Sequence, residues 1–354
     1  MPKKEGTVQF LLSFSDALCH AGVEVRVYLP TGVCDNKNGI FHYNLICLKD
    51  TLPLLGSKVR EVVRSIEELS PDKVIFTDEG RGSLAVLELL EDHGVKTAMV
   101  VHDPTPHPSR SNGGLKTRLS SFCYRVQWNR VFNRASEYIL LSNTSNSKFR
   151  QISPDLAARS GVMPLCPHPP VGVIGGRPDG LDCDLPNEKF YLFFGRIDEY
   201  KGLGRLMRAY AASNRKYPLV VAGGGSMSAE ERELSNRVAG IHLLNRFISD
   251  EEMVWLFGHC LCVCLPYIEA SQSGVLAMAY WYGKPVIVSN LNGLTEFVDQ
   301  DESGLIFDDE EGLIASINQM AEPGRAEKLG IGARKYFSCN LDWGKNVRRW
   351  LNGE

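Results

Sequence analysis

Two short stretches of the sequence place polar residues where apolar strands are expected to end. In the first, Gly195 and Arg196 directly follow the apolar run Phe190–Phe194. Lys201 then stands at the entry to the next predicted helix. Two cations beside the positive N-terminus of a helix suit a diphosphate, and fixed cations stabilise its developing charge without a metal. The alternative is that Arg196 and Lys201 are solvated surface cations.

The second stretch follows the apolar run Leu261–Leu265, where Glu269 precedes Ser271–Gly274 at a predicted helix start. Small residues let backbone N–H groups come close to a phosphate. A carboxylate beside such a site accepts hydrogen bonds from sugar hydroxyls. The alternative is that Glu269 and the serines only cap the helix.

The elements that must position these residues alternate between strand and helix, which is typical of parallel α/β layers. Ligands of such folds bind at the carboxyl ends of the strands. Strands are predicted over Val23–Leu29, Lys73–Phe76, Thr97–Val101, Ser136–Leu141, Phe190–Phe194, Leu219–Ala222, Ile241–Leu244, Leu261–Leu265 and Pro285–Val288. Helices are predicted over Thr7–Ala21, Leu84–His93, Leu203–Ser213, Ala229–Val238, Asp250–Gly258 and Ser271–Tyr282.

The length of 354 residues favours two domains over one core. A proline-rich stretch, 164–186, is a natural connection between them. We predict an N-terminal domain over 1–173 and a C-terminal domain over 174–340. The first helix already begins at Thr7, although a doubly wound domain begins with a strand. We expect that this first strand is missing from the sequence; the alternative is that Thr7–Leu12 is itself a strand.

Bulk composition excludes several classes of protein. The net charge of −3 provides no general attraction to nucleic acid. The ten cysteines include no CxxC pair, which argues against a zinc site and favours free thiols in the cytoplasm. His102, Asp103 and His107 surround prolines in poor metal geometry, so we expect no metal. No signal peptide is visible, and no apolar run approaches the roughly 20 residues of a membrane span.

The C-terminal half resembles the retaining glycosyltransferases of family 4, bacterial polysaccharide type, which have the GT-B fold. That resemblance implies two Rossmann-like doubly wound domains facing a cleft, and a terminal helix, 341–354, that crosses back to the N-terminal domain. The N-terminal half resembles the family more weakly, through 21–30 and 100–108. The C-terminal segments that carry the resemblance are FGRIDEYKGLGRLMRAY (194–210), LVVAGGG (219–225), NRFISDEEMVWLF (245–257), PYIEASQSGVLAMAYWYGKPVIVS (266–289) and NGLTEFVDQDESGLIFD (292–308).

The resemblance implies roles for individual residues. Arg196 and Lys201 match the pair that holds the donor diphosphate, and Glu269 matches the carboxylate that contacts the donor sugar. His102 matches a histidine that reaches the transferred sugar from the N-terminal domain; the alternative is a structural loop histidine. Glu296 matches a glutamate near the sugar, where many such residues only tie a loop. The remaining donor-binding positions are the strand-end glycines Gly195 and Gly224, the base-pocket residues Arg246 and Phe247, and the phosphate cradle Ser273, Gly274 and Val275.

The sequence also departs from the family. A second glutamate usually stands eight residues after the first and holds the ribose, but here that position is Ala277, followed by Met278. The ribose contact and the identity of the donor, UDP- or GDP-linked, therefore stay open.

The segment Arg110–Arg134 carries six basic residues, no acidic residue and interleaved aromatic residues. One interpretation is a helix on the inner membrane face, or a site for an anionic lipid-diphosphate acceptor. The other is an ordinary helix with its apolar stripe in the core.

Together these observations predict a retaining, metal-independent glycosyltransferase without a cofactor. It would move a sugar from a nucleotide-sugar donor to a glycan or lipid-linked acceptor in surface polysaccharide synthesis, and would bind no nucleic acid. Two alternatives stay open: a non-catalytic binding protein of the same type, favoured by Ala277, and a nucleotide-sugar epimerase of the same fold.

Overall fold

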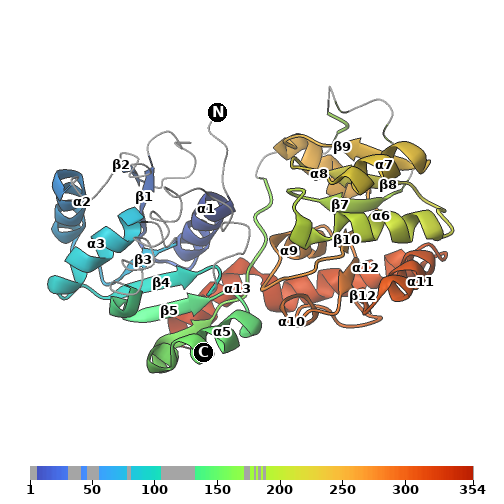
Figure 1. Cartoon of the computed structure of the whole chain (residues 1–354). Coiled ribbons are helices and arrows are strands. Elements are labelled where there is room, and N and C mark those ends of the chain that lie inside the picture. Colours follow the sequence, from blue (N-terminus) through green and yellow to red (C-terminus); the bar gives the residue numbers. More distant parts are fainter. Residues whose placement is uncertain are drawn as a thin grey trace. The chain divides into compact units, whose positions relative to one another are not determined.

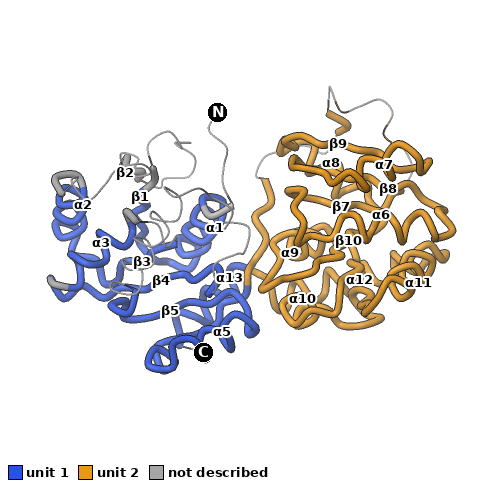
Figure 2. Tube along the Cα trace, viewed as in Figure 1, with its two compact units in different colours: residues 1–164, 343–354 blue, residues 165–342 orange. Residues whose placement is uncertain are grey.

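The computed structural model describes residues 6–30, 41–45, 56–77, 81–104, 132–170, 176–178, 181, 185 and 189–353 (Figure 1). The chain forms two compact units. The first comprises Met1–Pro164 together with Trp343–Glu354, and the second comprises Leu165–Asp342 (Figure 2). The end of the chain therefore belongs to the same unit as its N-terminal half. The boundaries predicted from the sequence were 173/174 and 340/341.

The described part of the second unit contains a six-stranded parallel sheet: β7 (Tyr191–Phe194), β8 (Leu219–Ala222), β9 (Ile241–Leu244), β10 (Cys262–Leu265), β11 (Val286–Ser289) and β12 (Gly304–Phe307). The strand order is β12-β11-β10-β7-β8-β9. From β7 the chain steps outward through β8 and β9, and from β10 it steps outward in the other direction. The order therefore reverses between the hydrogen-bonded neighbours β7 and β10. Ligands of open parallel sheets bind at such a reversal, outside the carboxyl ends of the strands.

Two helices of this unit begin at capping boxes that the sequence encodes. The side chains of Ser228 and Ser249 each accept the backbone N–H of the third helical residue, and the carboxylates of Glu231 and Glu252 accept the serine N–H in turn. Both helices thus begin with a capping box, which satisfies donors that a helix start leaves unpaired. The helices are α6 (Leu203–Ala212), α7 (Ala229–Arg237), α8 (Asp250–His259), α9 (Gly274–Trp281), α10 (Asn292–Thr295), α11 (Glu310–Met320) and α12 (Arg325–Tyr336).

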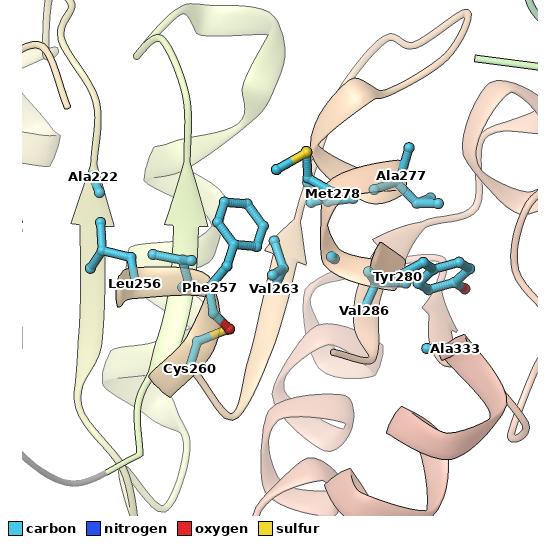
Figure 3. Close-up of a cluster of buried hydrophobic side chains, with 14 of the residues drawn as sticks. Ala222, Leu256, Phe257, Cys260, Val263, Ala277, Met278, Tyr280, Val286 and Ala333 are labelled. Carbon is cyan, nitrogen blue, oxygen red and sulfur yellow. The ribbon is translucent and has the colours of Figure 1, made fainter. Parts of the chain in front are cut away.

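Apolar side chains cover both faces of this sheet, because alternate strand residues point to opposite faces. Leu192 and Val220 belong to one buried cluster, which Phe257 of α8 also joins. Phe193 and Val221 belong to a second cluster with residues of α6 and α11. Figure 3 shows the first cluster where α8 and α9 lie over the strands. Burial on two faces explains why the central strands β7, β8 and β10 are apolar throughout, and the site lies beyond the ends of these strands.

The described part of the first unit contains a four-stranded parallel sheet, in the order β3-β4-β5-β6, and a separate parallel pair, β1 and β2. Thr7–Leu12 lies within a helix, so the alternative that it forms a strand is wrong. The elements are α1 (Gly6–His20), β1 (Arg26–Pro30), β2 (Phe41–Leu45), α2 (Gly56–Leu69), β3 (Val74–Phe76), α3 (Arg81–Asp92), β4 (Thr97–Val101), β5 (Glu137–Leu140), α5 (Asn143–Ile152) and β6 (Ser160–Val162).

The last helix, α13 (Trp343–Asn352), packs against α1 of the first unit. The ring of Trp343 lies 5.4 Å from that of Phe10 and 5.8 Å from that of Phe14, between centroids. Trp350 donates from Nε1 to Glu137 Oε1 at 2.7 Å. Aromatic packing and one indole hydrogen bond therefore hold the end of the chain in this unit.

Candidate functional site

The loops that follow β7 and β10 meet where the strand order reverses. The N–H of Ile268 donates to the carbonyl of Tyr200 at 2.7 Å. Gly202 has φ +66°, and a Cβ on it would lie 2.1 Å from the Pro266 carbonyl oxygen. Only glycine permits so close an approach of two backbones. The two stretches that the sequence marked separately therefore form one site.

Gly195 makes room for the ammonium group of Lys201. Gly195 has φ +103°, and a Cβ on it would lie 2.7 Å from Lys201 Nζ and 3.8 Å from Val275 Cγ2. The ammonium therefore lies over the end of β7, with the start of α9 beside it. Three predicted donor-site residues, Gly195, Lys201 and Val275, thus lie close together.

Lys201 is buried, with 8% of its surface exposed. Its Nζ lies 5.3 Å from the centroid of the Tyr267 ring. No carboxylate of residues 189–353 forms an ion pair with this ammonium. Burial of an ammonium group without a counter-ion is unfavourable, so an anionic ligand at this position would stabilise it.

Arg196 lies in the same loop and is exposed. Burial raises the pKa of the Tyr200 hydroxyl, while the positive charges of Lys201 and Arg196 act to lower it. Both cations are therefore near enough to Tyr200 to influence its ionisation. The loop after β7 therefore places one buried cation, Lys201, and one exposed cation, Arg196, at the carboxyl ends of the strands.

The start of α9 is the second part of the site. Ser273 is extended and caps the helix, because its Oγ accepts the N–H of Leu276 at 3.3 Å. The helix therefore begins at Gly274, whereas the sequence predicted Ser271. A Cβ on Gly274 would meet only Leu165 Cδ2 within 4 Å, at 3.7 Å. The first-turn N–H groups of Gly274 and Val275 form the positive end of a helix, which suits a phosphate.

Glu269 is exposed and lies in the loop between Tyr267 and the helix cap. No basic side chain of residues 189–353 forms an ion pair with it. Its carboxylate is therefore accessible to solvent, as a group that accepts hydrogen bonds from ligand hydroxyls must be.

The glycine run after β8 lies against the loop after β9. A Cβ on Gly224 would lie 3.4 Å from Arg246 C and 3.7 Å from Phe247 N. The Arg246 guanidinium donates two bonds to Glu252, at 2.9 and 2.7 Å. Phe247 is 66% exposed. Arg246 thus forms an ion pair with Glu252 in the first turn of α8. Phe247 presents an aromatic surface beside Gly224.

Glu296 ends α10, and its carbonyl accepts the hydroxyl hydrogen of Tyr336 at 3.0 Å. A Cβ on Gly293 of the same helix would lie 2.3 Å from the Ala270 carbonyl oxygen. The helix that carries Glu296 therefore packs directly on the loop that carries Glu269.

Ala277 and Met278 are 1% and 8% exposed and belong to the buried cluster that includes Phe257 and Val263 (Figure 3). Apolar core residues thus occupy the position at which the resemblance implied a ribose-binding glutamate.

His102 follows β4 in the first unit. Its Nε2 lies 2.9 Å from the Thr77 carbonyl oxygen, and the ring of Phe10 meets it edge-on at 5.3 Å. Because a carbonyl only accepts, we assign the proton to Nε2. The predicted contact of His102 with a sugar stays a prediction.

Several predicted features lie outside the described residues, namely His107 and residues 110–131 of the basic segment. Residues 132–134 of that segment are described, and Phe132 among them is buried. Among the described helices, none has the length and apolar character needed to cross a bilayer. Within the same residues, no group of three His, Cys, Asp or Glu side chains is arranged to hold a metal ion.

A separate hollow of about 480 Å³ lies at the amino-terminal ends of β7, β10 and β11 in the second unit. Lys284, in its lining, donates to the carbonyls of Gly258 and Cys260, and Lys189 pairs with Glu327. Lys284 and Lys189 therefore already have partners within the fold, and no predicted site residue lines the hollow.

Sequence reasoning missed two residues of the site. Tyr267 contacts Lys201, and its only signal was an aromatic residue after Pro266 at a strand end. Glu252 holds Arg246, and the spacing Ser249-x-x-Glu252 could have revealed it as a capping box.

Residues 188–322 match the family described as glycosyl transferases group 1. Over 157 residues the chain is 30% identical to the O-antigen chain mannosyltransferase C of Escherichia coli, with 42% of each protein covered. Over 159 residues it is 28% identical to the D-rhamnosyltransferase WbpZ of Pseudomonas aeruginosa, covering 42% of this chain and 40% of the relative. The chain thus matches less than half the length of these relatives.

Two crystal structures are similar over nearly the whole chain. The Anabaena protein Alr3699/HepE in complex with UDP-glucose has a TM-score of 0.70 at 16% identity, covering 100% of this chain and 98% of that one. A glycosyltransferase from Rickettsia africae has a TM-score of 0.70 at 14% identity, covering 99% and 95%. The chain therefore has the GT-B fold of two Rossmann-like α/β domains, and its residues 188–322 are similar to the glycosyl transferases of group 1.

Proposed function

We propose that this chain is a glycosyltransferase that takes a sugar from a UDP- or GDP-linked donor. The observation that carries the proposal is the buried Lys201 ammonium, which lies without a carboxylate partner among residues 189–353, beside the start of α9. A nucleoside diphosphate supplies the missing negative charge. The UDP-glucose complex of the similar Anabaena protein supports this choice of ligand.

The chemistry follows from the positions of the charges. Lys201, Arg196 and the N-terminus of α9 would stabilise the diphosphate as its bond to the sugar breaks, without a metal. Glu269 would orient the sugar through its hydroxyls. In a retaining transfer the acceptor hydroxyl attacks the face that the diphosphate leaves and gives its proton to the departing phosphate. No protein nucleophile and no cofactor is needed.

The acceptor in this proposal is a glycan or a lipid-linked sugar of a bacterial surface polysaccharide. The similarity to a mannosyltransferase of O-antigen chains and to a rhamnosyltransferase supports that setting. We propose a cytoplasmic location, with Arg110–Arg134 as a contact to the inner membrane face.

A panel of UDP- and GDP-sugars tests the proposal by thermal shift and product analysis. A ligand that binds only the folded state at 100 times its Kd stabilises it by about 2.7 kcal/mol. Binding and transfer to an acceptor are expected with at least one donor. If no donor binds and none is transferred, the proposal that the chain is an enzyme fails and the non-catalytic alternative is favoured. If a donor is converted without an acceptor, the chain is an epimerase.

Lys201→Met keeps the apolar stem and removes the charge. We expect turnover to fall by at least about 100-fold, the scale of a lost charge-stabilising group. Stability without ligand should not fall, because a buried charge without a counter-ion is removed. Lys328→Met, at an exposed position on α12, is the matched control for both measurements. Near-normal turnover in Lys201→Met would contradict the phosphate assignment.

A further inference from the structure

Tyr267 contacts Lys201, Tyr200 and the cap of α9. Its ring lies under the Lys201 ammonium, at 5.3 Å from the centroid, and meets the Tyr200 ring edge-on at 6.1 Å. Its hydroxyl lies 3.5 Å from Oγ of Ser273, the cap of α9. Tyr267 is 4% exposed, so the ring is held by its surroundings.

We propose that Tyr267 is a positioning residue: its ring holds the Lys201 ammonium at the place where the donor diphosphate binds. This inference rests on the proposed function. In the absence of ligand the ring presents its negative face to the ammonium, and no carboxylate of residues 189–353 pairs with Lys201. A flexible lysine side chain pays rotamer entropy when a ligand orders it. A lysine already held by the ring avoids most of that cost.

The ring, and not the hydroxyl, performs this role. An O–H···O separation of 3.5 Å to Ser273 is too long for a strong hydrogen bond, so the hydroxyl contributes little. The backbone residues on either side of Tyr267, Pro266 and Ile268, are also held in place. Gly202 abuts the Pro266 carbonyl, and the Ile268 N–H binds the Tyr200 carbonyl. These backbone contacts join the segment that carries the ammonium to the segment that carries the ring.

The first test measures UDP and GDP affinity by calorimetry for Tyr267→Leu, which removes the ring, and Tyr267→Phe, which keeps it. We expect Tyr267→Leu to weaken binding about tenfold, within the range of a partly desolvated cation–π contact. Tyr267→Phe should stay close to the unmodified protein. The matched control is Tyr217→Leu, which breaks a second lysine–tyrosine contact of this unit, with Lys216 at 5.7 Å from the ring centroid.

A double-mutant cycle separates positioning from a general structural effect. If Tyr267 acts through Lys201, Tyr267→Leu adds no further loss in the Lys201→Met background. Equal losses in both backgrounds would overturn the inference.

If Tyr267→Leu does not fold, a series of variants at position 267 that keeps the shape of the aromatic ring provides a second test. Phenylalanine and its mono-, di- and trifluorinated analogues, placed at position 267, progressively weaken the negative ring face. Affinity for the diphosphate should fall stepwise along the series, and a flat series would overturn the inference.

The two proposals fail in different ways. If the unmodified protein binds no nucleoside diphosphate, the proposed function fails. If it binds one and Lys201→Met weakens binding while ring removal and fluorination do not, only the role of Tyr267 fails.

Discussion

At the residue scale, the pair of Arg246 and Glu252 shows how one carboxylate serves two purposes. Glu252 accepts two hydrogen bonds from the Arg246 guanidinium and also accepts one from the Ser249 N–H. Burial acts to raise the pKa of Glu252, but these hydrogen bonds and the charge of Arg246 lower it below its ordinary value. The ionised carboxylate therefore stabilises the folded state and holds the loop that carries Phe247.

Glu252→Gln keeps a capping side chain and removes the charge. Because Arg246 is 40% exposed, we expect a loss of only about 1 kcal/mol at pH 7. The folded-state pKa is lowered, so this stability is present above the ordinary carboxyl pKa of about 4.3 and disappears as pH falls below it. Urea unfolding of both proteins from pH 7 to pH 3 should show their difference shrinking. A difference that stays constant to pH 3 would contradict this, and Glu322→Gln, at an exposed position, is the control.

At the scale of elements, glycines determine how closely the loops at the strand ends approach. A Cβ on Gly223 would lie 2.0 Å from the Gly195 carbonyl oxygen, and one on Gly225 would lie 2.1 Å from that of Ile197. The loops after β7 and β8 are thus packed backbone to backbone. The same principle joins the loop after β7 to the loop after β10 at Gly202.

Gly202→Ala tests this packing. Alanine at positive φ costs about 1–2 kcal/mol, and here its methyl group would also collide with the Pro266 carbonyl. Gly324→Ala is the matched control, since Gly324 has φ +75° and no atom near its Cβ position within 4 Å. We expect chemical denaturation to show a larger loss for Gly202→Ala, together with weaker nucleotide binding. Equal losses in the two variants would show that the loop contact contributes nothing.

At the scale of the whole molecule, the chain leaves the first unit at Pro164 and returns to it at Trp343. Trp350 connects the end of the chain to the first unit through three groups. Its indole N–H binds Glu137, Lys73 Nζ lies 4.9 Å from its ring centroid, and the Phe14 ring lies 5.9 Å away. The last helix is therefore a structural part of a unit built mainly from the other end of the sequence.

Trp350→Ala should weaken this attachment. We expect a loss of about 2–3 kcal/mol, below the range for a fully buried tryptophan because Trp350 is half-buried. Hydrogen exchange should become faster in α1 and β5, while α9 and β10 of the second unit keep their protection. Leu351→Ala, at an adjacent residue that is 45% exposed, is the control. Faster exchange in α9 and β10 would contradict the assignment of α13 to the first unit.

The sequence alone predicted several of the buried strands, but not the apolar strand β12. The strands Thr97–Val101 and Leu219–Ala222 have the predicted bounds and are buried along their whole length. The edge strand Ile241–Leu244 also has the predicted bounds, although only Leu244 is fully buried. Sequence reasoning also missed α12, because Gly330 and Gly332 are typical of a helix break. In the structure these glycines permit contacts that only the fold reveals, with Cβ positions 2.5 Å from the Gly283 carbonyl and 1.9 Å from that of Glu302.

For the site, local sequence located the ends of β7 and β10 and placed the start of α9 three residues too early, because strand ends and caps depend on neighbouring residues. It thereby identified Gly195, Arg196 and Lys201 in one loop, and Glu269 and Ser273 in the other. Tertiary structure decided that these loops meet, since β7 and β10 are neighbours only through a reversal of strand order. It also decided that Lys201 is buried against Tyr267, a contact between residues 66 positions apart that no local pattern records.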